Sequence, residues 1–112
     1  MQYALMIHAE PGYAEALSDA DREAVVAGFS ALAEDPRTLV GAALQPAETA
    51  TCVRMARGRT LITDGPFADT KEVLGGFALI EAANLDEALA VAARIPAARL
   101  GGVIEVRPVM RG

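Results

Sequence analysis

Residues 75–96 read GGFALIEAANLDEALAVAARIP. The apolar run that begins at Gly75 has the length and composition of a buried strand. Asn84, with Glu87 three positions later, is a cap for a helix that Pro96 ends. The predicted apolar stripe of this helix is formed by Leu85, Ala88, Leu89 and Ala92. This stretch therefore predicts a strand followed directly by an amphipathic helix.

A strand follows this helix, and the same order occurs at the start of the chain. Residues 101–110 read GGVIEVRPVM, where two apolar residues alternate with two charged ones, which is typical of a half-polar strand. Residues 2–9 are apolar on both sides and predict a buried strand. Ser18 and Asp21 then cap a helix that ends before Pro36. Two strand–helix–strand halves are therefore expected.

Between the two halves, residues 38–44, 50–56 and 60–63 predict a meander of antiparallel strands. The whole chain, 1–112, then forms one α+β domain that resembles the ferredoxin-like plait, an antiparallel sheet with two helices on one face. The other sheet face is left bare, and a large exposed apolar sheet is a liability in a monomer. We expect a homodimer with a half-closed barrel, and a cleft for a small molecule between the subunits.

The composition excludes several classes of partner and cofactor. A net charge of −5 argues against nucleic acid, which is bound through clustered Lys and Arg. The N-terminal apolar run is far shorter than a membrane span of about 20 residues. The single Cys52 suits a reducing cytosol, so a cytoplasmic protein is expected. The sequence has no glycine-rich phosphate loop, no Cys/His metal spacing and no Gly-x-Ser-x-Gly elbow, which predicts no cofactor and no metal.

The loop at residues 63–72, TDGPFADTKE, is the first candidate site. Asp64 is predicted to be a base or an anionic wall of the cleft, and the alternative is a turn residue that bonds its own backbone. Phe67 stacks on a ligand or anchors the loop. Lys71 offers a cation for a carboxylate ligand, or belongs to a solvated surface.

Charged and titratable residues on the predicted strands are the second set of candidates. His8, the only histidine, is a potential acid–base group beside Asp64, and the alternative is a strand-end histidine held by a hydrogen bond. Arg54, Glu105 and Arg107 interrupt apolar runs and are candidates for ligand binding. Their alternative is an ion network between strands or subunits.

Four segments together resemble the DGPF branch of the YCII-related proteins, over nearly the whole chain: MQYALMIHAEPG, LVGAALQP, TLITDGPFADTKEVLGGFALIEA and AARIPAARLGGVIEVRPVM. The resemblance implies a dimeric α/β barrel, and an acid and a histidine near the cleft. Many relatives read Gly-Glu-Gly-Leu-His-Pro where this chain has residues 41–46, GAALQP, so both groups are missing from that segment. Gln45 cannot titrate and is a ligand-binding candidate only.

Two functions follow from these observations. The first is an enzyme in which Asp64 and His8 move a proton on a small organic acid or enone. The second is a ligand-binding or regulatory module without chemistry, which the absence of a complete catalytic set favours. Some relatives are fused or adjacent to sigma factors, so the resemblance also allows an interaction module that docks on a transcription factor.

Overall fold

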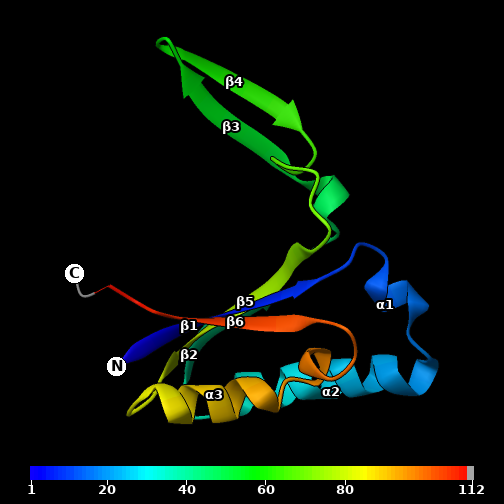
Figure 1. The fold of residues 1–112 in the computed structure, drawn as a ribbon, viewed down its shortest axis with the longest axis vertical. Helices are drawn as coiled ribbons and strands as arrows, with labels where there is room; N and C mark the ends of the chain where they lie inside the picture. Colours follow the sequence, from blue (N-terminus) through cyan, green and yellow to red (C-terminus); the bar gives the residue numbers. More distant parts are fainter. Residues whose placement is uncertain (111–112) are drawn as a thin grey trace.

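The computed structural model describes residues 1–110 and consists of a four-stranded antiparallel sheet, helices on one face of it, and a separate two-stranded hairpin (Figure 1). The strands are β1 (Gln2–Ala9), β2 (Thr38–Ala43), β3 (Thr51–Ala56), β4 (Arg59–Asp64), β5 (Val73–Glu81) and β6 (Val103–Pro108). The helices are α1 (Tyr13–Ala16), α2 (Asp19–Glu34) and α3 (Leu85–Ala93), with 3-10 turns η1 (Ala47–Thr49) and η2 (Pro96–Ala98). Within the described part of the chain, no helix is long and apolar enough to cross a membrane.

The sheet has the strand order β2-β5-β1-β6, with every neighbouring pair antiparallel. This is the order of the ferredoxin-like plait, so the predicted α+β fold is confirmed. The predicted meander is wrong at one step, because β2 pairs with β5 and not with β3. Pro46 and η1 follow β2 and turn the chain out of the sheet, so β3 and β4 pair only with each other.

The core lies between the sheet and the helices. Every second residue of β1 is buried on this side, and Leu5 and Ile80 at its centre are fully buried. Both predicted caps are confirmed: the Ser18 hydroxyl accepts a hydrogen bond from the backbone N–H of Asp21, and the Asn84 side chain accepts one from Glu87.

The predicted stripe of α3 is half wrong. Ala88 and Ala92 are buried as expected, but Leu85 and Leu89 are exposed and Val91 is buried in their place. The helix is therefore rotated about its axis from the predicted orientation. Two alanines and a valine bring α3 closer to the sheet than leucines would allow.

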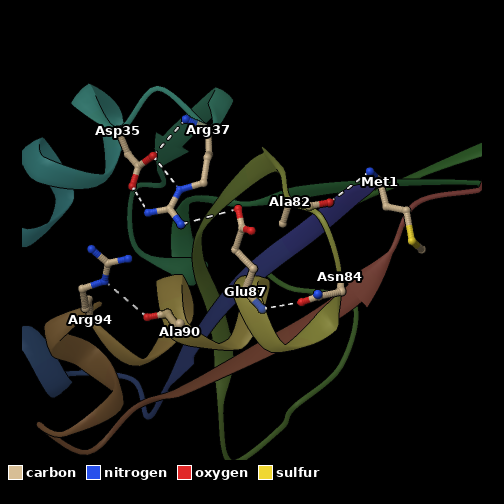
Figure 2. A network of polar contacts seen from close by, with 8 residues as sticks. All are labelled: Met1, Asp35, Arg37, Ala82, Asn84, Glu87, Ala90 and Arg94. Atoms are coloured by element: carbon tan, nitrogen blue, oxygen red, sulfur yellow. Dashed lines mark hydrogen bonds and ion pairs between the residues drawn. The ribbon is translucent and has the colours of Figure 1, made fainter.

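A cluster of charges joins the end of α2 to the start of α3 (Figure 2). The guanidinium of Arg37 donates two hydrogen bonds to Asp35, of 3.0 and 2.8 Å, and its Nη1 lies 3.6 Å from the Glu87 carboxylate. The backbone N–H of Arg37 donates a third bond to Asp35. Donation from the Arg37 side chain and backbone lowers the pKa of Asp35 from 3.8 to about 2.

Replacing Asp35 by Asn is expected to lower the free energy of unfolding at pH 7 by about 1–2 kcal/mol, because charge-assisted hydrogen bonds are lost. A depressed carboxyl pKa stabilises the fold above the ordinary value of 3.8, and this contribution is lost as the pH falls toward 2. The difference between wild type and Asp35→Asn in urea unfolding should therefore shrink between these pH values. Asp69→Asn, in an exposed loop, is the control, and a difference that stays constant with pH would contradict the assignment.

Candidate functional site

The sheet face that carries no helix is lined by alternate residues of all four strands. On β1 these are Ala4, Met6 and His8, each partly buried between buried neighbours that point to the core. Met6 lies opposite Phe77 on β5 and opposite Glu105 on β6. We call this surface the open face.

His8, Glu105 and Arg107 form a chain of polar contacts on the open face. The Nε2 atom of His8 lies 3.1 Å from Oε1 of Glu105, and Nη2 of Arg107 donates a hydrogen bond to Oε2 of the same carboxylate. The register explains the contact, because His8 lies opposite Val103 and Met6 lies opposite Glu105, which places His8 and Glu105 diagonally on adjacent strands. The side chains of His8, Glu105 and Arg107 are 26%, 41% and 67% exposed.

This arrangement keeps Glu105 ionised and orients His8. Hydrogen bonds from Arg107 and from His8 hold the pKa of Glu105 below its ordinary value. A carboxylate can only accept a hydrogen bond, so in neutral His8 the proton resides on Nε2. The lone pair of Nδ1 is then available, and in residues 1–110 this atom makes no hydrogen bond.

Both readings of His8 agree with the contacts. The pair of Glu105 and Arg107 is an ion pair along one strand, not the expected network between strands or subunits, and His8 is bonded across to the next strand. The same contacts also produce a fixed imidazole and a partly free guanidinium beside an apolar surface. The sequence identified His8, Glu105 and Arg107 as candidates, but it did not predict that Met6 and Phe77 lie beside them. The apolar residues on both sides of the first strand were the feature that could have indicated this.

Two further candidates lie on the hairpin and not on the open face. Asp64 ends β4 opposite Thr51 and is exposed. Arg54 lies opposite Leu61, on the other face of the hairpin. Within residues 1–110, no hydrogen bond or ion pair joins Asp64 to His8.

The remaining candidates lie in the connections at the base of the hairpin. Phe67 is 82% exposed and Gln45 is exposed directly after β2. The ammonium of Lys71 lies 3.8 Å from the Glu10 carboxylate, a contact between exposed groups that contributes little. The backbone N–H of Gly65, directly after Asp64, donates to the carbonyl of Ala50 at 2.7 Å and closes this base.

Other parts of the described chain offer less chemistry. Residues 1–110 hold no group of three or more His, Cys, Asp or Glu side chains arranged for a metal ion. A shallow, open hollow runs along α2, away from the open face, and is lined by Asp19, Arg22, Glu23, Val26 and Ala27. Arg22 there is committed to the backbone carbonyls of the turn before the helix.

Comparison with known proteins gives two matches that cover nearly the whole chain. The family model of the YCII-related domain matches residues 1–111. An uncharacterised protein of Rhizobium meliloti (strain 1021) is 38% identical over 114 residues, which cover 97% of this chain and 92% of that protein.

Proposed function

The chain belongs to the YCII-related family, and we propose that it binds a small organic acid or enone on the open face, over His8 and Arg107. The observation that carries the proposal is the contact chain His8–Glu105–Arg107. The turn Asp64-Gly65-Pro66-Phe67 supports a place in the DGPF branch of the family.

Arg107 supplies the recognition of a negative charge. Glu105 occupies only one of its donor nitrogens, and a guanidinium has five N–H donors, so a ligand carboxylate can bond to the rest. Met6 and Phe77 are partly buried on the same face and provide an apolar surface for the body of the ligand. A small molecule with one acidic end and an unsaturated or aliphatic body fits this combination.

His8 supplies the acid–base chemistry in the enzyme form of the proposal. Its Nδ1 accepts a proton from a carbon or hydroxyl of the ligand, and Glu105 stabilises the imidazolium that results. Nδ1 then returns the proton to another atom of the same ligand. The net reaction is an isomerisation by proton transfer, which needs no cofactor. In the alternative form the same residues bind the ligand without chemistry, and Gln45, which cannot titrate, agrees with that form.

We also propose that the protein is a cytoplasmic homodimer in which the open faces of the two subunits face each other. Val40 on β2 and Leu74 on β5 are 51% and 39% exposed in the single chain. Covering such residues is favourable by about 25 cal/mol per Å² of apolar area. Two sheets that face each other would form the half-closed barrel expected from the sequence.

A thermal-shift screen of small carboxylates tests the binding site. A carboxylate at about 100 times its Kd should stabilise the wild type by about 2.7 kcal/mol, a rise in Tm of about 10 °C. Arg107→Gln and His8→Gln should lose most of this rise, while Arg99→Gln, which removes an exposed arginine elsewhere, should keep it. Equal shifts in all four proteins would refute the site.

Solvent deuterium separates the enzyme from the binding module. For a carboxylate that binds, incorporation of deuterium at a ligand carbon in wild type but not in His8→Gln supports proton transfer. Binding without any exchange supports the module.

A further inference from the structure

We propose that the β3–β4 hairpin is an arm that packs on the open face of a second copy of the chain, so that each ligand site is closed by the partner's hairpin. This inference rests on the proposed function for the identity of the site, but its structural part can be tested without a ligand.

The hairpin carries an apolar face that nothing in residues 1–110 covers. The register places Val53 opposite Ile62 and Met55 opposite Thr60, so these four side chains lie on one face. Val53, Met55 and Ile62 are 70%, 65% and 70% exposed. A soluble protein rarely leaves three large apolar side chains together in water without a partner.

The hairpin also stands apart from the body of the molecule (Figure 1). Its two-residue turn has positive φ at Arg57 and Gly58, as a type I′ hairpin requires. An isolated two-stranded hairpin is nevertheless only marginally stable in water. A surface that packs against it would supply the missing stabilisation.

The dimensions show how much surface is left to cover. The radius of gyration is 15.6 Å, whereas a compact domain of this length has about 13 Å. The accessible surface is 7740 Å², whereas a compact monomer of 11.7 kDa has about 5,900 Å². The excess of about 1,800 Å² per chain lies in the range that each subunit of an obligate homodimer buries.

A second copy of this chain fits the arm in shape, polarity and charge. The open face, with Met6 and Phe77, is the apolar sheet surface that no helix of the described residues covers. A two-fold axis lets each arm cover the other subunit's open face, so that both surfaces are buried and the assembly closes. The arm carries three arginines, Arg54, Arg57 and Arg59, against one acid, whereas the whole chain has a net charge of −5. A basic arm and an acidic body attract each other between copies.

The arm also explains how Asp64 can belong to the site. Asp64 lies two positions beyond Ile62 on β4, so it shares the apolar face of the hairpin. When this face packs on the partner, the carboxylate enters the interface. The site would then combine His8, Glu105 and Arg107 of one subunit with the hairpin of the other.

The first experiment measures the dimer by sedimentation at several concentrations. The wild type should be a dimer at micromolar concentration, and Val53→Asp with Ile62→Asp should raise the dimer Kd by at least a hundredfold, because two apolar anchors become charges. Leu61→Asp, on the opposite face of the same hairpin, is the matched control and should raise it by less than tenfold. A monomeric wild type, or equal effects of both changes, would overturn the proposal.

The second experiment does not depend on the variants remaining dimeric. In a Cys52→Ser background, one chain carries Ile62→Cys and a differently tagged chain carries Phe77→Cys, and the mixture is treated with a bismaleimide. A linked pair of the two tags is expected. A third chain that carries both Ile62→Cys and Phe77→Cys is treated in the same way. If a link forms within this chain but no link forms between the two tagged chains, the hairpin folds back on its own sheet and the proposal is overturned. A linked pair combined with no ligand shift in the carboxylate screen would leave the arm in place and refute the proposed function alone.

Discussion

Replacing Gly28 by Ala is expected to destabilise the protein by about 3 kcal/mol, although the same change inside a helix is ordinarily favourable by about 1 kcal/mol. Gly28 lies in α2, against the buried Pro96 of η2. A Cβ at Gly28 would lie 2.3 Å from Cδ and 2.4 Å from Cγ of Pro96. A proline ring cannot rotate away, so the helix must move and open its contact with η2.

The measurement is the Tm, which should fall by more than about 10 °C for a domain of this size. Ser30→Ala, on the exposed side of the same helix, is the control and should leave the Tm equal or slightly higher. Pro96→Ala removes the two clashing carbons, so the double variant should be more stable than the sum of the two single changes predicts by about 1 kcal/mol or more. A Gly28→Ala protein as stable as Ser30→Ala would contradict this packing.

Replacing Gly102 by Ala is the second large expected effect, and it connects the core to the candidate site. A Cβ at Gly102 would lie 2.9 Å from the carbonyl oxygen of Ala97 and 2.9 Å from that of His8. Both contacts are with backbone, which yields less readily than a flexible side chain. We expect a loss of about 2–3 kcal/mol and a displacement of the strand end that carries His8.

Gly75→Ala is the matched control, because a Cβ there would approach only the carbonyl oxygen of Ile7, at 3.9 Å. Its stability should change by less than about 1 kcal/mol. Urea unfolding measures both changes, and the imidazole resonances of His8 should move in Gly102→Ala only. An unchanged His8 signal in a destabilised Gly102→Ala protein would contradict the expected displacement of the strand end that carries His8.

The sequence predicted the elements whose signals are local. The caps at Ser18 and Asn84 depend on hydrogen bonds that span three residues, and both form as expected. The orientation of α3 was wrong, since the periodicity of Leu85 and Leu89 identifies an apolar face but not how closely the helix approaches its sheet. The pairing of β2 with β5 was missed because it joins segments far apart in the chain.

The site shows the same limit. His8 and Glu105 are 97 positions apart, and only the register of β1 and β6 brings them within a hydrogen bond. The sequence named both as candidates, His8 as the single histidine and Glu105 because it interrupts an apolar run, but no spacing rule links them. Asp64 was expected beside His8 because its turn holds several charged residues, but the structure places it on the hairpin. No local sequence pattern predicts that this hairpin stands apart from the sheet (Figure 1).

The central claim is that His8 is held by Glu105 with Nδ1 free for a ligand on the open face. Because His8 is the only histidine, a long-range ¹H–¹⁵N NMR spectrum identifies the tautomer of its imidazole without resonance assignment of the protein. At a pH where the ring is neutral, we expect the tautomer with the proton on Nε2. A bound carboxylate should shift Nδ1 saturably, and Glu105→Gln should weaken both features. A tautomer mixture like that of free histidine, unchanged by every carboxylate that stabilises the protein, would contradict the account.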